Sequence, residues 1–239
     1  MIEEGYYEVE EIGNAEKSIE YGSQHKNEED ALKIKEITEE IKGKVEENNK
    51  RKKRRTGEKM KFWAIDMAKE AKECTKLAGT EKELDKLMHY IFGYGESIID
   101  KWDPTLELYV KEGNISESDV YRFSSAFFVI NKKAKVIFDL LTKEDIEYLD
   151  FICKDADLVI VNPIRVIDCI NMDTSKYKVY KGNKDLIQFF DKIYFKDGVI
   201  GDTNLFIAKH LENNVIICSN ILKETIEKNN IRGFCFQYL

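Results

Sequence analysis

Apolar and polar positions follow two different periods along this chain. Near its start, isoleucine and valine recur every three or four residues in an otherwise charged segment, at Ile34, Ile37, Ile41 and Val45. This spacing places them on one face of a helix. Asn27 can cap that helix, and the carboxylates after it complement the helix dipole. The pattern predicts a helix within Asn27–Arg55.

Two more helices are predicted between Met60 and Ile91. In the first, small and apolar residues fit helical spacing, and Gly79 suits the position after a helix end. These residues are Ala64, Met67, Ala68, Ala71, Cys74 and Leu77. The second begins at Thr80, which forms a capping box with Glu83.

After Asp103–Pro104 the period changes to that of β-strands. Thr105–Lys111 alternates apolar and polar residues, as a half-buried strand does. Further strands are predicted at Ala126–Ile130, Asp157–Val161, Ile164–Ile170, Lys192–Lys196, Leu205–Ala208, Val215–Cys218 and Gly233–Tyr238. Asn162–Pro163 should separate two of them. Thr142 and Asp145 form another capping box, which predicts a short helix at Glu144–Leu149.

Two segments share one order of elements. In each, an apolar strand leads to a polar cap, Asn131 or Ser219, and then to an amphipathic helix, Lys132–Leu141 or Asn220–Lys228. A duplicated module or the commonest strand–helix connection would both produce this order. The predicted fold class is α+β, with mixed or antiparallel sheets and these two strand–cap–helix units, preceded by a charged helical extension. The predicted domains are residues 1–59 and 60–239.

Composition and charge narrow the function classes. The 239 residues are 43% hydrophobic, enough for a sizeable core. The net charge of −7 argues against a general nucleic-acid binder, whose affinity comes from neutralising phosphates. No apolar stretch approaches the roughly 18 residues of a membrane span, and the acidic N-terminus does not resemble a signal peptide. A cytoplasmic location without membrane partners is therefore expected.

A basic run, Lys50–Arg55, follows the first predicted helix. It fits either a nucleic-acid patch or a solvated helix end, and the acidic residues before it favour the second. The narrow apolar stripe of that helix must pack on something. It could pack on the main domain or on a second copy, so self-association through the N-terminal helix is one possible contact.

Catalytic and metal-binding patterns are sparse. The five cysteines are widely spaced in apolar runs, which favours reduced core residues. The sequence has no CxxC, HExxH or phosphate-binding glycine loop, so no metal or cofactor is expected. Asp168 and Asp173 could form a carboxylate pair, although local turn chemistry is favoured for Asp173. An enzyme with an unrecognised carboxylate site therefore stays open.

Other polar and aromatic residues favour structural roles. Trp63 and Trp102 flank apolar runs, which favours core packing over ligand stacking. Arg165 and Asp168 could form a salt bridge that anchors strand ends, which is also a structural role.

Five segments occur in an order that resembles a known family. They are MKFWAID, IIDKWDPTLELYVKEG, FFVINKKAKVIFDLL, VNPIRVIDCINMD and VIICSNILKETIEKNNIRGFCFQYL. Over residues 60–239 the chain resembles the bacterial polymorphic-toxin immunity family called immunity protein eleven. Residues 1–59 have no counterpart in it, and KYKVYKGNKDLIQFFDK departs from its pattern.

The resemblance implies binding without catalysis. The partner would be a cognate toxin, the C-terminal domain of an effector secreted in contact-dependent competition. The motif positions, which we expect to be structural, are Trp102, Pro104, Arg165, Asp168, Ser219, Gly233 and Phe236.

An inhibitor of this kind needs a complementary surface of roughly 800 Å² with aromatic anchors. Its acidic charge would steer it towards a basic groove. We predict that Tyr177, Tyr180, Phe189 and Phe190 contribute to partner binding, with core packing as the alternative for the two phenylalanines. The other class that fits is an intracellular regulator in which Asn27–Arg55 binds nucleic acid or dimerises while the α+β domain senses a ligand.

Overall fold

The computed structural model describes residues 32, 35–36, 38–39, 42–43, 61–75, 95–111, 117–123, 127–211 and 215–239. The chain divides into two compact units, Met1–Lys50 and Arg51–Leu239. In the first unit the described residues are helical. Four predictions fall outside the described residues. They are the apolar stripe of the first helix, the basic run that follows it, the boundary at residue 60 and the helix after Thr80.

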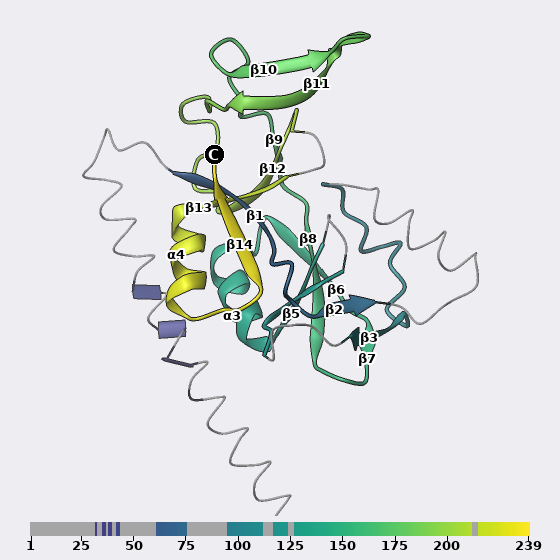
Figure 1. Cartoon of the computed structure of the whole chain (residues 1–239). Helices are drawn as coiled ribbons and strands as arrows, with labels where there is room; N and C mark the ends of the chain where they lie inside the picture. Colours follow the sequence, from purple (N-terminus) through teal and green to yellow (C-terminus); the bar gives the residue numbers. More distant parts are fainter. Residues whose placement is uncertain are drawn as a thin grey trace, which may run out of the picture. The chain divides into compact units, whose positions relative to one another are not determined.

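A five-stranded sheet carries the C-terminus (Figure 1). Its strands, in spatial order, are β14 (Phe234–Tyr238), β1 (Phe62–Met67), β13 (Ile216–Ser219), β12 (Leu205–Ala208) and β9 (Val166–Ile167). Neighbouring strands are antiparallel, except that β12 and β9 are parallel.

A seven-stranded sheet forms the other large layer. In spatial order it contains β6 (Ile146–Leu149), β8 (Leu158–Pro163), β5 (Phe128–Asn131), β4 (Val120–Arg122), β2 (Glu73–Thr75), β3 (Glu107–Lys111) and β7 (Ile152–Cys153). Two of its pairs, β2–β4 and β3–β7, are parallel. The prediction of an α+β fold with mixed and antiparallel sheets is therefore confirmed.

Both strand–cap–helix units are present. Helix α3 (Lys132–Leu141) follows β5, and the Asn131 side chain accepts a 3.0 Å hydrogen bond from Ala134 N. Helix α4 (Asn220–Lys228) follows β13, and Ser219 Oγ accepts from Leu222 N at 3.2 Å. Each cap satisfies a backbone N–H that the first helical turn leaves without a partner.

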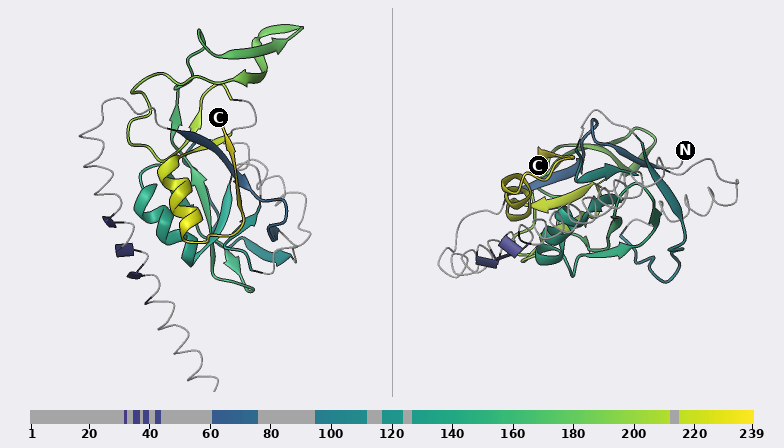
Figure 2. Two further views of the ribbon diagram at one scale, coloured as in Figure 1. Left: turned by 60° about the vertical axis from the view of Figure 1, so that its left-hand side comes forward. Right: turned by 90° about the horizontal axis from the view of Figure 1, so that it is seen from below.

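The two helices lie side by side and antiparallel (Figures 1 and 2). Asn204 joins the end of α3 to the start of α4, because its amide donates to Leu141 O at 2.9 Å and its oxygen accepts from Ser219 Oγ at 2.7 Å. At the opposite ends, Asp119 accepts from Asn131 Nδ2 and from Arg232 N, both at 2.9 Å. Two polar side chains thus fix how the two units pack.

The first predicted helix after Met60 is wrong. Residues 62–67 form β1, which lies between β13 and β14, and residues 73–75 form β2. The small and apolar residues that fit helical spacing fit an interior strand as well, and pairing on both sides decides the conformation.

The predicted helix at Glu144–Leu149 is also wrong, because Ile146–Leu149 form β6. Thr142 instead ends α3, where its hydroxyl donates to Phe138 O at 2.8 Å. Asp145 is buried and accepts from the backbone N–H groups of Asn204 and Leu205. Both residues of the apparent capping box are therefore used in other contacts.

Three strand predictions need correction. Asn162 and Pro163 do not form a break after the strand, because both belong to β8 and Pro163 is its last residue. The strand predicted at Ile164–Ile170 shrinks to the two residues of β9. Lys192 ends β11 (Asn183–Lys192), and residues 193–196 are outside any strand, with a single bridge from Phe195 to Ile170.

Candidate functional site

The hairpin of β10 (Lys176–Tyr180) and β11 forms a sheet of its own and stands away from the two larger sheets (Figures 1 and 2). Its base is tied to the body. Tyr194 N donates to Ser175 Oγ at 2.9 Å, and Asn171 N donates to Tyr194 O at 2.8 Å. The hairpin therefore projects from a fixed base.

The hairpin brings together all four aromatic residues predicted to bind a partner. Tyr177, Tyr180 and Phe189 are 38%, 42% and 42% exposed. Phe190 is half-buried and packs against the core cluster that contains Phe62 and Phe206. Core packing thus accounts for Phe190, while the other three rings are available at the surface.

The strand register places the exposed rings on both faces of the hairpin. Tyr177 pairs with Phe190, and their ring centroids are 5.6 Å apart. The adjacent position, Lys178, pairs with Phe189, and its Nζ lies 4.8 Å from the centre of that ring. Successive cross-strand pairs lie on opposite faces of a sheet. Tyr177 therefore lies on one face and Phe189 on the other.

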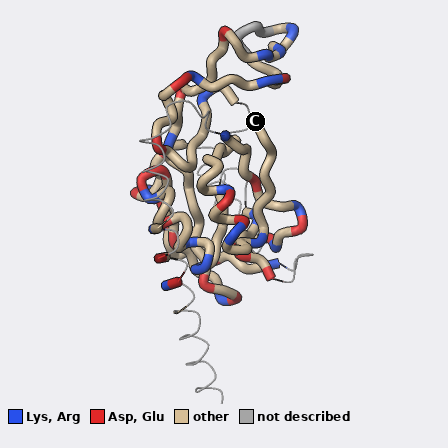
Figure 3. The backbone as a smooth tube through the Cα atoms, turned by 90° about the vertical axis from the view of Figure 1, so that its left-hand side faces the viewer, with Lys and Arg blue, Asp and Glu red and all other residues tan. Residues whose placement is uncertain are grey.

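The hairpin is basic in an acidic chain. Residues 176–192 contain five lysines and two aspartates, a net charge of +3, whereas the whole chain carries −7. Lysines recur along the hairpin (Figure 3). Within the described part of the chain, no carboxylate lies within ion-pair distance of Lys176, Lys178, Lys181 or Lys192. Sequence analysis missed this feature, although the spacing of lysines in KYKVYKGNK could have shown it.

The motif positions in the Trp102 loop have structural contacts. Trp102 is buried in the core cluster with Phe127, and its Nε1 donates to Asp150 O at 2.6 Å. Pro104 occupies the turn closed by Leu106 N, which donates to Asp103 O at 3.2 Å. Proline favours this second turn position because its ring fixes φ.

Gly233 and Phe236 are placed by β14 and the turn before it. Gly233 has φ +114°, and a Cβ built there would lie 2.6 Å from Val120 O. Phe236 is half-buried against Phe234, with ring centroids 6.3 Å apart, and Lys223 Nζ lies 5.5 Å from its ring centre. Gly233 therefore allows the backbone to approach Val120 closely, and Phe236 packs beside Phe234 and Lys223, so both positions have structural roles.

The Asp168 carboxylate pairs with Lys196, at 2.8 Å, and not with Arg165 as predicted. Lys196 holds the Asp168 pKa below its ordinary value. His210 Nε2 lies 3.9 Å from the same carboxylate. Arg165 lies beyond the end of β8, where its backbone N–H donates to Asp145 O and its carbonyl accepts from Ile207 N.

Asp173 lies in the expected turn, but a different side chain holds that turn. The Asn171 oxygen accepts from Asp173 N at 3.1 Å and from Thr174 N at 3.3 Å, while Asp173 itself is exposed.

Three of the five cysteines are buried, as predicted. Burial raises the pKa of Cys74 and Cys218 to about 12 and that of Cys169 to about 11. Cys235 is exposed, which contradicts the core prediction, because it lies on the solvent face of the edge strand β14. These thiols are poor nucleophile candidates, since the reactive form is the thiolate.

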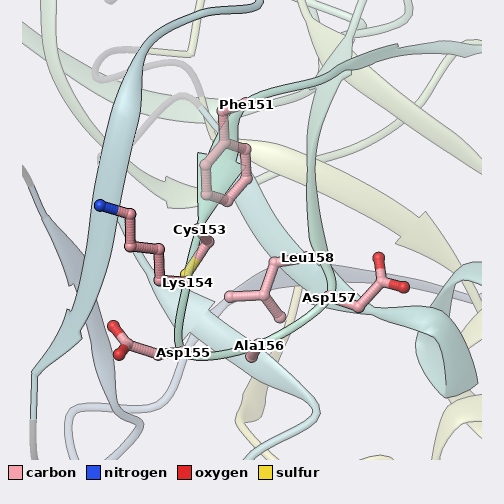
Figure 4. Close-up of a pocket in the computed structure, with 7 residues that line it drawn as sticks. All are labelled: Phe151, Cys153, Lys154, Asp155, Ala156, Asp157 and Leu158. Carbon is pink, nitrogen blue, oxygen red and sulfur yellow. The ribbon is translucent and has the colours of Figure 1, made fainter.

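A pocket of about 380 Å³ lies between β7 and β8 (Figure 4). It is lined by Phe151, Cys153, Lys154, Asp155, Ala156, Asp157 and Leu158. The carboxylates of Asp155 and Asp157 point to opposite sides. Asp155 accepts from Val110 N at 2.9 Å, and Asp157 pairs with Lys132 at 2.5 Å. The pocket therefore lacks convergent polar groups of the kind that orient a ligand.

Two features are absent from the described residues, a cluster of metal ligands and a membrane-spanning helix. No group of three or more histidine, cysteine, aspartate or glutamate side chains among them could hold a metal ion. No helix in this part of the chain is both long and apolar enough to cross a membrane.

The family model described as "Immunity protein family (Imm11)" matches residues 59–239. No curated protein matches the chain.

Proposed function

The chain belongs to the Imm11 immunity protein family, and from this premise we propose that it binds and neutralises a cognate bacterial toxin domain, without catalysing a reaction. The family match carries the proposal. The inhibitor would occlude the toxin or lock it in an inactive form, and it would act in the cytoplasm of the cell that makes it. The toxin would be the C-terminal domain of a secreted effector.

We place the toxin-binding surface on the β10–β11 hairpin. Its exposed aromatic rings have the side-chain types that dominate binding energy in protein interfaces. The hairpin base is anchored in the core through Phe190, so this part of the hairpin would lose little conformational freedom on binding. Self-association through the N-terminal helix remains a separate possible contact.

The test is rescue by co-expression. The C-terminal domain of a large secreted protein encoded beside this gene would be expressed in a sensitive host, alone or with the full-length chain. Rescue together with a co-purifying complex is the expected result. Toxicity that the full-length chain neither relieves nor binds would refute the proposed function for this pair.

The surface is tested by alanine substitution. Tyr177→Ala with Tyr180→Ala should weaken toxin binding by about 30-fold or more, since even one central aromatic anchor carries roughly 2 kcal/mol. Ile99→Ala with Ile152→Ala is the matched control, because these apolar side chains are 52% and 43% exposed elsewhere on the molecule. Equal affinities for the two double variants would remove the hairpin from the toxin-binding surface.

A further inference from the structure

We infer that the β10–β11 hairpin inserts into an acidic cleft of its protein partner, with both of its faces in contact. The inference rests on the proposed function and specifies the surface that the toxin presents. Three features of the hairpin carry it, namely its isolation, its two aromatic faces and its uncompensated positive charge.

The hairpin is isolated beyond its base. Among the described residues its two strands pair only with each other, and a two-stranded ribbon is marginally stable in water unless another surface covers it. The fixed contacts lie at the base, through Ser175, Tyr194, the Phe195 bridge and the Phe190 ring. Tyr180 and Phe189 lie above them and remain exposed. These rings expose apolar surface to water and make few contacts within the molecule. This is expected of side chains that a partner covers.

Exposed rings on both faces of the hairpin distinguish a partner with a cleft from a partner with a flat surface. Tyr177 lies on one face with Phe190, and Phe189 lies on the other with Lys178. A flat partner would cover one face and leave the ring on the other face in water. A cleft that admits a two-stranded ribbon covers both. The distribution of the exposed rings therefore favours insertion.

Charge identifies the lining of the cleft. The hairpin carries +3, and its described lysines have no carboxylate partner. Lys178 and Lys192 lie over the rings of Phe189 and Tyr194, which leaves both charges available to a partner. Enclosing unpaired ammonium groups is costly unless opposite charges meet them, so the facing groups must be carboxylates of a protein. A nucleic-acid strand is disfavoured as the partner, because the chain as a whole carries −7.

The charge test uses the full-length chain and the toxin domain captured by co-expression. Lys176→Glu, Lys178→Glu and Lys181→Glu together should weaken binding by about 100-fold, through faster dissociation as enclosed charge pairs are lost and through slower association. Lys69→Glu, Lys143→Glu and Lys154→Glu together are the control. These side chains are also exposed, lie outside the hairpin and change the net charge equally. The control should bind within about threefold of the unchanged chain.

Arginine at the same three hairpin positions keeps the charge and should retain binding within about threefold. A melting temperature equal to that of the unchanged chain shows that each variant is folded. Equal weakening by the hairpin and control reversals would overturn the acidic lining, because net charge alone would then explain the effect. Full binding and rescue by the hairpin reversal would overturn the inference and leave the proposed function standing.

The cleft is tested one face at a time. Tyr177→Ala and Phe189→Ala should each weaken binding by about tenfold or more. A loss confined to one of them would replace the cleft by a flat contact. If the unchanged chain neither binds nor rescues, the proposed function and this inference both fail.

A final experiment distinguishes a protein partner from a nucleic-acid partner. Fluorescence anisotropy with a 20-nucleotide single-stranded DNA would report binding through the hairpin lysines. No binding at about 10 µM protein and near-physiological salt is expected. Binding to DNA that the glutamate reversals abolish would overturn the inference in favour of nucleic acid.

Discussion

At the scale of single residues, Gly233 shows how a motif position can be required by geometry. Its φ of +114° is rare for residues with a side chain, and the backbone at Val120 lies where its Cβ would be. The turn around it joins the two large sheets, since Ala68 N donates to Gly233 O at 2.7 Å and Asp119 N donates to Arg232 O at 2.9 Å. A side chain here would separate β4 from β1.

Gly233→Ala should lower the free energy of unfolding by about 3 kcal/mol or more, from backbone strain plus overlap with Val120 O. Gly198→Ala is the matched control. Its φ is +74° but nothing lies within 4 Å of the added Cβ, so only about 1 kcal/mol of strain is expected. Urea denaturation measures both. Equal losses would mean that the Val120 contact relaxes without cost.

The cysteines give a second prediction at this scale. The pKa values of Cys74 and Cys218, about 12, and of Cys169, about 11, keep these thiols protonated near pH 8, and burial blocks access to them. Iodoacetamide at pH 8 should therefore modify Cys235 first, because it is exposed. Mass spectrometry of the native and urea-unfolded protein would show it. Modification of Cys74 in the native state at the rate seen in urea would contradict the packing described.

At the scale of elements, the two strand–cap–helix units are joined through their caps. Ser219 caps α4 and also donates to Asn204, which holds the end of α3. The amide of Asn204 thus connects the end of α3 to the start of α4. Such a residue should show energetic coupling with the cap that it contacts.

Ser219→Ala should cost about 1–2 kcal/mol of stability, because the cap of α4 and the bond to Asn204 are both lost. Asn204→Ala should cost about 2 kcal/mol, since Leu141 O loses its partner. The double variant should lose at least about 0.5 kcal/mol less than the sum. Denaturant titration of the three variants completes the cycle. Strict additivity would show that the Ser219–Asn204 bond contributes nothing.

At the scale of the whole molecule, the sheets and the hairpin have different roles. The large sheets and two helices enclose the buried rings of Phe128 and Phe138, and the half-buried ring of Phe234 forms stacked or edge-on pairs with both. The outer hairpin contributes little to the core, because among its described side chains Phe190, near the base, is the one that packs against a core cluster, the cluster of Phe62 and Phe206. Stability and partner binding should therefore be separable.

Replacing residues 178–189 by a short Asn-Gly turn should leave the melting temperature within about 5 °C of that of the full chain, while toxin binding and rescue are lost. Tyr177 and Phe190 are kept, so the contacts at the base remain. Thermal unfolding followed by circular dichroism, with co-expression rescue, measures both properties. Rescue by the shortened chain would show that the toxin contacts the body of the molecule.

The sequence by itself determined the features that depend on neighbouring residues. Asn131 and Ser219 were identified as caps, and α3 and α4 follow them, because a cap bonds N–H groups only a few residues away. The α+β class and the strand at Thr105–Lys111 also followed from local periodicity. The family resemblance was carried by the order of short motifs along residues 60–239, and the family match confirmed it.

Tertiary structure decided what depends on distant partners. Residues 62–67 became a strand because β13 and β14, from the far end of the chain, pair with both of their edges. Asp168 pairs with Lys196 and not with Arg165, three positions away in sequence, because the backbone bond from Lys196 N to Cys169 O and the Ile170–Phe195 bridge bring the two segments together. The hairpin's aromatic positions were predicted, but their division between two faces follows from a register with bulges. Long-range pairing selects among conformations that local spacing permits equally, so these features required the folded molecule.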